Sequence, residues 1–166
     1  MPAPNPKITE EPKKGLYSGE MKDGEAEGVG KEIFANGNSY QGLYENGNRH
    51  GLGLSVFNNG NSYFGEFKNG YRNGHFHVIY ENGRTYAGDF KDDLKHGYGV
   101  ATYPSGEEYS GQFKAGEWHG LGTFIKQPGE KYIGEWSDGF KNGEGIQTYP
   151  DGTVEEGIWK DDMFNP

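Results

Sequence analysis

One pattern of residues recurs every 23 positions along almost the whole chain, with no insertion or deletion between copies. In the third copy, Tyr63 is followed by Gly65, Phe67, Gly70 and Gly74. The leading residue of the successive copies is Tyr17, Tyr40, Tyr63, Tyr86, Tyr109, Tyr132 and, in the seventh, Glu155. A fixed period of this length indicates a repeat array, in which each copy is one supersecondary unit that packs against the next.

Composition supports a folded array rather than a disordered chain. Only 31% of the residues are apolar, which by itself is typical of disorder. Aromatic residues make up 15%, however, and every glycine except Gly15 occupies one of the fixed glycine positions of the repeat. Cysteine is absent, so disulfides and thiolate metal sites are excluded. A net charge of −9 disfavours binding to DNA or RNA.

The period divides the chain into a tail and an array. Residues 1–15 are rich in proline and are predicted to be a flexible tail. The array spans 16–166, and its six repeats cover 17–39, 40–62, 63–85, 86–108, 109–131 and 132–154. A half repeat, 155–166, follows them and is expected to act as the cap that arrays need at their ends.

Residue patterns within the repeat predict its secondary structure. Numbered from position 1 at the leading tyrosine, positions 1–5 and 14–18 show the period-two patterning typical of β-strands. Positions 20 and 21 include Asn36-Gly37, a strong hairpin signal because both residue types tolerate a positive φ. Each repeat is therefore predicted to form one β-hairpin. The whole array is predicted to form an all-β, elongated, single-layer antiparallel β-sheet.

The spacing also suggests a register for this sheet. With position 5 opposite position 14, position 3 faces position 16 and position 1 faces position 18. One face then carries the aromatic rings, and each position-5 ring lies over a glycine at position 14. Aromatic pairs across strands contribute roughly 0.2–1 kcal/mol each, and glycines in strands permit tight bends. The aromatic face is therefore predicted to be concave.

No residue pattern indicates catalysis. His50, His96 and His119 share position 11, but neighbouring copies of this position lie roughly 10 Å apart, too far for a shared zinc ion. His75 and His77 have no evident third ligand. The carboxylates lie beside lysines on a solvated face, without the apolar pocket that raises a pKa for acid–base work. The sequence therefore predicts no enzyme activity, no catalytic residue, no metal site and no cofactor.

The aromatic face is the best candidate for a binding site. Phe76 replaces the glycine of position 14, and the register places its ring between Phe67 and Phe90. Val78 and Phe124 make position 16 apolar as well. An apolar patch rimmed by polar residues is typical of a site for a partner's amphipathic helix or extended peptide. The predicted protein-binding groove consists of Tyr63, Phe67, Phe76, Val78, Tyr86, Phe90, Tyr109, Phe113 and Phe124.

Two other interactions are alternatives to the groove. The basic residues at position 10 are Arg49, Arg72, Lys95 and Lys141, and they are predicted to form a row along the hairpin tips. Clustered basic residues attract anionic lipid at about 1 kcal/mol each, so contact with phosphoinositide headgroups of a membrane is the second choice. The unpaired end strands of the sheet offer pairing with a second copy, which would give a homodimer.

The run from Tyr40 to Gly53, Tyr-Gln-Gly-Leu-Tyr-Glu-Asn-Gly-Asn-Arg-His-Gly-Leu-Gly, resembles the MORN repeat. The resemblance covers 17–164 and departs from the pattern at Phe76, Asp93, Lys126, Glu155 and Asp162. It implies an elongated single-layer sheet with a groove. Stand-alone arrays of this family resemble adaptors and scaffolds rather than enzymes. The resemblance therefore implies a cytoplasmic, protein-binding scaffold associated with the cytoskeleton, with the axoneme of a cilium or flagellum as one candidate location.

Overall fold

The computed structural model describes residues 15–126 and 128–165. These residues divide into two compact units, an N-terminal unit over 15–93 and a C-terminal unit over 94–165. Apart from Gly15, the tail predicted for residues 1–15 lies outside the described residues.

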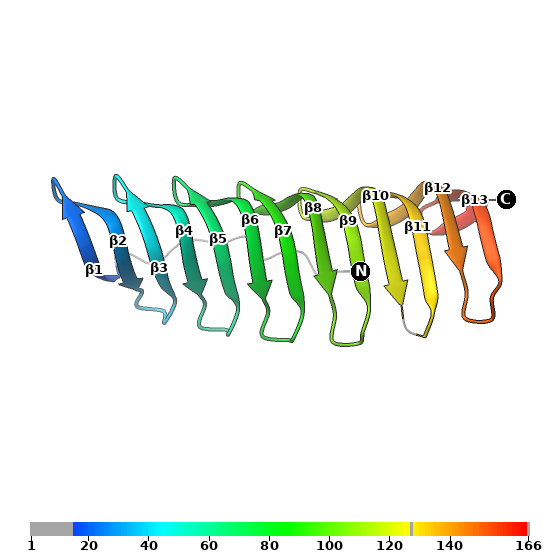
Figure 1. Ribbon diagram of the computed structural model, residues 1–166, viewed down its shortest axis with the longest axis horizontal. Coiled ribbons are helices and arrows are strands. Elements are labelled where there is room, and N and C mark those ends of the chain that lie inside the picture. The colour runs from blue at the N-terminus through cyan, green and yellow to red at the C-terminus, as the bar shows by residue number, and fades with distance from the viewer. Residues whose placement is uncertain (1–14, 127, 166) are drawn as a thin grey trace. The chain divides into compact units, whose positions relative to one another are not determined.

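The N-terminal unit is a sheet of seven strands that follow one another in chain order (Figure 1). Each strand is antiparallel to the next. The strands are β1 (Leu16–Lys22), β2 (Glu25–Ile33), β3 (Ser39–Glu45), β4 (Asn48–Val56), β5 (Ser62–Lys68), β6 (Tyr71–Ile79) and β7 (Thr85–Lys91).

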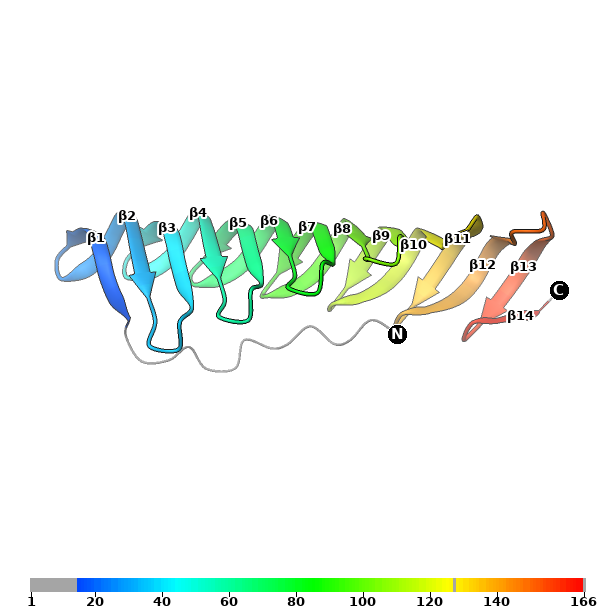
Figure 2. The same ribbon diagram turned by 90° about the horizontal axis from the view of Figure 1, so that it is seen from below.

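The C-terminal unit is built in the same way, again with antiparallel neighbours in chain order. Its strands are β8 (Leu94–Thr102), β9 (Glu108–Lys114), β10 (Glu117–Lys126), β11 (Glu130–Ser137), β12 (Phe140–Thr148), β13 (Val154–Lys160) and β14 (Met163–Asn165). The described residues contain no helix, and the view of Figure 2 shows a single layer of strands. The prediction of an all-β, single-layer antiparallel sheet of tandem hairpins is confirmed.

The turn that closes each hairpin lies at positions 7 and 8, between the two predicted strands of the repeat. In the second repeat, Asn46 has a φ of 48° and Gly47 a φ of 76°. Positive φ at both central residues defines the two-residue type I′ turn, which matches the twist of the flanking strands. This turn joins β3 to β4.

The predicted Asn-Gly turn at positions 20 and 21 connects one repeat to the next and has a different geometry. Only Gly37 has a positive φ, of 86°. Its amide donates to the carbonyl of Phe34 over 2.9 Å, and the Phe34 amide donates to the carbonyl of Asn38 over 2.9 Å. This is a three-residue loop, a type I turn followed by a glycine bulge. Asn36 therefore needs no left-handed conformation there.

The observed register differs from the predicted one by two residues. Gly42 pairs with Gly53, and Tyr40 pairs with Ser55, so position 3 faces position 14 and position 1 faces position 16. The tight turn is the cause, because it fixes the pairing from its own end of the hairpin. A shift by an even number of residues leaves every side chain on its own face. The residues predicted to share a face therefore still share it, although their direct partners change.

A bulge interrupts the pairing within the hairpin. Between the Gly42–Gly53 pair and the Tyr44–Arg49 pair, β3 contributes one residue and β4 contributes residues 50–52. Gly51, inside the bulge, has a φ of 60°. Bulges bend a strand and re-aim its side chains. Here the bulge brings Arg49, at position 10, onto the same face as the rings.

The core of each unit is the face that carries the rings, called the inner face below. The Tyr40 ring lies over Gly42 and Gly53: a methyl group built on Gly53 would lie 2.5 Å from the ring's Cε2 atom. The Tyr40 hydroxyl donates to the carbonyl of Leu43 over 3.0 Å. Its ring meets the Phe67 ring edge-on, with centroids 5.1 Å apart. The ring over bare backbone is thus the position-1 tyrosine, whereas the sequence predicted the position-5 ring.

Burial of these tyrosines makes stability depend on alkaline pH. Burial raises the pKa of Tyr40 and of Tyr132 to about 12, against about 10 in an unfolded chain. A raised folded-state pKa gives stability that is fully present below pH 10 or so and is lost as pH rises toward 12. We expect urea midpoints to be constant from neutral pH to about pH 9 and to fall steeply above about pH 10. Urea midpoints that stay constant up to about pH 12 would contradict this.

Candidate functional site

The residues of the predicted groove lie on the inner face, but they are packed rather than open. In the N-terminal unit all six are at most 4% exposed, and Phe76 is fully buried. In the C-terminal unit Tyr109 and Phe113 are buried, and Phe124 is half-buried. The rings cover one another, because each lies against its neighbours along the sheet. These rings therefore form the core of the array, and direct partner contact with them stays a prediction that their burial does not favour.

Phe76 occupies the place that a position-1 tyrosine takes in other repeats. Its ring lies between those of Phe67 and Phe90, with centroid distances of 5.2 and 5.1 Å, as the sequence predicted. Tyr63 packs instead against Phe57, at 5.3 Å, and Tyr80, at 6.1 Å. A side chain at position 14 fills the space over the glycine backbone, so the tyrosine of this repeat is displaced. Phe76 thus replaces a ring of the core and adds no exposed one.

The sequence pattern did not predict that Trp118 belongs to the core. It stands at position 10, which was expected at the solvated tips, yet it is buried on the inner face of the C-terminal unit. Its ring stacks on Tyr109 with centroids 4.3 Å apart and planes 4° apart, and it contacts the Trp136 ring edge-on at 4.9 Å. The bulge turns position 10 inward, and nothing in the period-two pattern of the sequence marks it.

The predicted basic row also belongs to the inner face. The Arg72 guanidinium carbon lies 4.5 Å from the Tyr63 ring centroid, and the residue is 3% exposed. Arg49 is buried, and Lys95 and Lys141 are half-buried over aromatic rings. A cation over a ring face is attracted by the ring quadrupole. The predicted position of these side chains, in a solvated row along the hairpin tips, is therefore wrong. Contact of these residues with lipid headgroups stays a prediction that the burial of both arginines does not favour.

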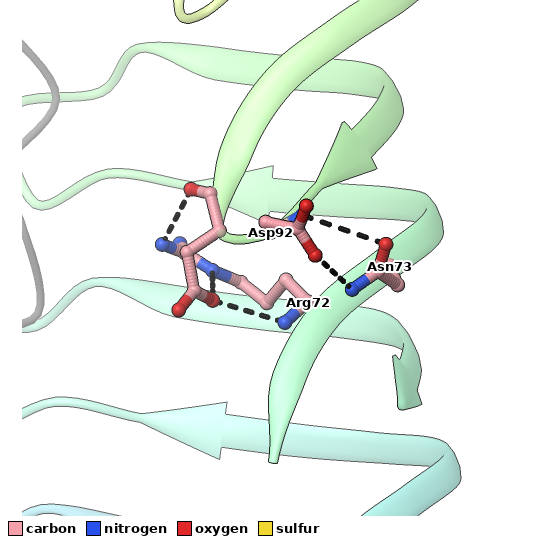
Figure 3. Close-up of polar contacts among 4 residues, drawn as sticks. Arg72, Asn73 and Asp92 are labelled. Atoms are coloured by element: carbon pink, nitrogen blue, oxygen red, sulfur yellow. Dashed lines mark hydrogen bonds and ion pairs between the residues drawn. The ribbon is translucent and has the colours of Figure 1, made fainter. Parts of the chain in front are cut away.

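Asp93 explains one departure from the repeat pattern. Its carboxylate accepts hydrogen bonds from the Arg72 amide at 2.9 Å and from the Arg72 Nε atom at 3.0 Å, while its carbonyl accepts from Nη2 at 2.9 Å (Figure 3). Beside it, the Asn73 side-chain amide donates to Asp92 over 3.2 Å. Asp93 has a φ of 68°, an unusual conformation for a residue other than glycine. The carboxylate at this turn pairs a buried guanidinium, which a glycine there could not do.

We expect Asp93→Gly to lower the free energy of unfolding by about 1.5–3 kcal/mol, the usual worth of hydrogen bonds to a charged group. Glycine relieves the backbone at this φ, but it leaves the Arg72 guanidinium without its carboxylate. Asp162→Gly is the matched control, because the Asp162 carboxylate accepts from the backbone amide of Lys141 at 2.8 Å and that lysine is only half-buried. Urea unfolding measures both. An Asp93→Gly protein as stable as the wild type would show that the Asp93 carboxylate does not stabilise the buried Arg72 guanidinium.

The opposite face of the N-terminal unit, called the outer face, exposes large apolar side chains, whereas the sequence predicted a solvated face of carboxylates beside lysines. Phe64 is 49% exposed and lies directly across from Leu54. Val29 lies directly across from Leu43. Leu43 and Leu52 both line an open hollow of about 520 Å³, together with the polar residues His50 and Glu66. The outer apolar patch consists of Val29, Leu43, Leu52, Leu54 and Phe64.

Metal clusters and membrane-spanning helices are both absent from the described residues. No group of three or more histidine, cysteine, aspartate or glutamate residues within 15–126 and 128–165 is placed to hold a metal ion. In the same stretches, no helix is long and apolar enough to cross a membrane.

Two solved structures are similar to the chain at low identity. One is the SAS-4 (dCPAP) TCP domain in complex with a proline-rich motif of Ana2 (dSTIL) of Drosophila melanogaster, with 13% identity, 93% of this chain and 99% of that chain covered, and a TM-score of 0.42. The other is the TCP10 domain of Danio rerio CPAP in complex with a peptide of Danio rerio STIL, with 15% identity, 79% and 68% covered, and a TM-score of 0.32. Comparison with curated protein sequences gave no match. Similarities this weak carry no conclusion about a ligand of this chain.

The family model described as the MORN repeat matches six stretches that together make up more than half of the chain. They are 17–39, 40–62, 63–75, 86–108, 109–131 and 132–154. These are the six repeats expected from the period, except that the third match ends one residue before Phe76, the side chain that displaces Tyr63. The chain belongs to the MORN repeat family.

Proposed function

We propose that this protein is a non-enzymatic scaffold that binds a protein partner through the outer apolar patch. One observation carries the proposal: the inner face uses its rings as a core, whereas the outer face of the N-terminal unit leaves large apolar side chains in water. Leu52 is 54% exposed and Val29 is 57% exposed. Contiguous exposed apolar side chains rimmed by polar residues are typical of protein-binding surfaces.

The energetics of such a surface favour a partner. Apolar area removed from water contributes about 25 cal/mol per Å², and none of this gain is used while the patch stays exposed. Cross-strand neighbours such as Leu54 and Phe64 present adjoining side chains to one partner element. Glu66 and His50 at the rim of the hollow add polar contacts that fix its orientation. The partner expected here is an apolar face of a helix or strand.

The cellular setting we propose is a cytoskeletal assembly, with a cilium or flagellum axoneme as its more specific form. The support is the resemblance of stand-alone MORN arrays to cytoskeletal and ciliary scaffolds. Fluorescence imaging of the tagged protein beside a tubulin marker tests this setting. The two other interactions, membrane contact through the basic residues and a homodimer through the end strands, are not favoured by any contact described above.

The test of the outer patch compares two charged variants. Leu52→Glu with Phe64→Glu places two carboxylates in the patch without touching the inner core, so we expect the protein to stay folded and to lose its partner. Val154→Glu is the matched control, because Val154 is 55% exposed and lies in the C-terminal unit. Quantitative affinity capture from the native cell is the measurement, with circular dichroism to verify folding. Capture of the same proteins in the same amounts by the folded double variant would contradict the proposal.

A further inference from the structure

Position 10 holds a cation between two particular rings in two repeats. In the third repeat, Arg72 lies 4.5 Å from the Tyr63 ring centroid and 4.9 Å from that of Phe90. These rings are position 1 of the same repeat and position 5 of the next. In the C-terminal unit, Lys141 Nζ lies 4.9 and 4.7 Å from the corresponding rings of Tyr132 and Trp159. The third and sixth repeats thus supply their own cation to this pair of rings.

The first repeat has the rings but lacks the cation. Its position-10 residue is Ala26, too short to reach them. The corresponding rings, Tyr17 and Tyr44, have centroids 5.2 Å apart and planes 86° apart. The Tyr132–Trp159 pair, which does receive a lysine, has nearly the same geometry, at 5.4 Å and 83°. Where the third and sixth repeats carry Arg72 and Lys141, the first repeat has a hollow of about 410 Å³ lined by both rings and Ala26.

Two carboxylates complete the hollow. Glu32 and Glu25 both line it, and neither forms an ion pair with any residue of 15–126 or 128–165. The Glu32 carboxylate accepts one hydrogen bond from the Gly15 amide at 3.2 Å and one from the Tyr44 hydroxyl at 3.4 Å. Glu32 stands at position 16. In the sixth repeat that position is Gln147, whose Oε1 atom accepts a hydrogen bond from Lys141 Nζ at 2.5 Å. Glu32 therefore offers a charged acceptor at the place where another repeat uses a neutral one to hold its own cation.

We propose that this hollow is a binding site for an arginine side chain of a partner polypeptide. The guanidinium group is planar, so it stacks on an aromatic ring while its N–H groups pair with a carboxylate. Tyr44 and Tyr17 provide the ring faces, and Glu32 provides the carboxylate. Attraction between a cation and rings strengthens where water is partly excluded, and Tyr44 is buried. This site lies on the inner face and does not depend on the outer apolar patch.

The test uses the full chain and a blocked Gly-Gly-Arg-Gly-Gly peptide, followed by NMR at constant ionic strength. We expect the peptide to shift the signals of Tyr17, Ala26 and Tyr44, and we expect the same peptide with neutral citrulline in place of arginine to leave them unmoved. Glu32→Gln should weaken binding about fivefold, the worth of one partly exposed ion pair. Ala26→Arg should abolish binding and raise the urea midpoint, because its own side chain then fills the hollow.

Three outcomes would overturn the proposal. The first is equal binding of the arginine and citrulline peptides. The second is arginine-peptide binding that Glu32→Gln and Ala26→Arg both leave unchanged. The third is binding that is detected only after Lys13 and Lys14 are replaced by serine, which would mean that the chain supplies its own cation. Peptide capture here and protein capture by the outer patch are measured separately, so failure of one leaves the other standing.

Discussion

Gly53→Ala is expected to destabilise the fold by about 3 kcal/mol, the upper end of the usual cost of forcing an extra methyl group into a packed core. Gly53 has no positive φ, so alanine fits its backbone, and in a strand interior alanine is normally preferred to glycine by about 0.5–1 kcal/mol. The added methyl group would nevertheless lie 2.5 Å from the Cε2 atom of Tyr40, whose ring covers this glycine. Tyr40 is fully buried, so moving its ring aside would break its contacts with the Phe67 ring and the Leu43 carbonyl.

Gly70→Ala is the control for this prediction. Gly70 has a φ of +86°, but no atom lies within 4 Å of the position that a methyl group would take. Its cost is the left-handed backbone alone, about 1–2 kcal/mol. Urea unfolding followed by tyrosine fluorescence measures both variants. If Gly53→Ala cost no more than Gly70→Ala, the ring would not depend on the bare backbone.

Replacing Phe76 gives the second large effect. Alanine is usually more stable than glycine in a strand, but at this position we expect the glycine variant to be the more stable one. Phe76→Ala is expected to cost about 3–5 kcal/mol, because it leaves a cavity between the rings of Phe67 and Phe90. Phe76→Gly removes one carbon more than Phe76→Ala, but it restores the bare glycine backbone that the other repeats have at position 14. The Tyr63 ring can then move over the bare backbone at positions 3 and 14 and fill the cavity.

We therefore expect Phe76→Gly to be more stable than Phe76→Ala by about 1–2 kcal/mol, the value of partly refilling a cavity. The intrinsic preference of strands is the opposite, by about 0.5–1 kcal/mol. Near-ultraviolet circular dichroism and urea midpoints of the two variants decide between these orders. A glycine variant less stable than the alanine variant would show that Tyr63 does not take the vacated place.

Much of the fold could be predicted because a strict period constrains it. The hairpin per repeat and the face shared by Tyr40 and Phe67 follow from period-two patterning, which an even register shift cannot change. The Phe76 ring also lies between the rings of Phe67 and Phe90 as predicted, because the even register shift keeps it on their face, although its direct partners are Gly65 and Gly88. These inferences depend on which face a residue lies on and do not require its direct partner.

The register and the site could not be predicted, because two turn signals compete within one repeat. Asn36-Gly37 and Asn46-Gly47 look alike in sequence, yet only the second forms the two-residue turn that sets the pairing. No sequence signal marks the bulge around Gly51 either, and this bulge turns Arg49 onto the inner face. The sequence also could not predict which aromatic side chains are exposed to solvent. A ring such as Phe90 is equally apolar in a core and in an open groove, and only the packing of its neighbours distinguishes the two.

The core of the sheet depends most on one kind of contact, represented by the Tyr40 ring lying over the bare backbone of Gly53. A double-mutant cycle with Tyr40→Ala and Gly53→Ala measures it directly by urea unfolding. We predict that Gly53→Ala, costly in the wild type, becomes nearly neutral once Tyr40 is alanine, which gives a coupling of at least about 2 kcal/mol. Additive costs, with Gly53→Ala equally harmful in both backgrounds, would contradict the claim that tyrosine over glycine forms the core of this sheet.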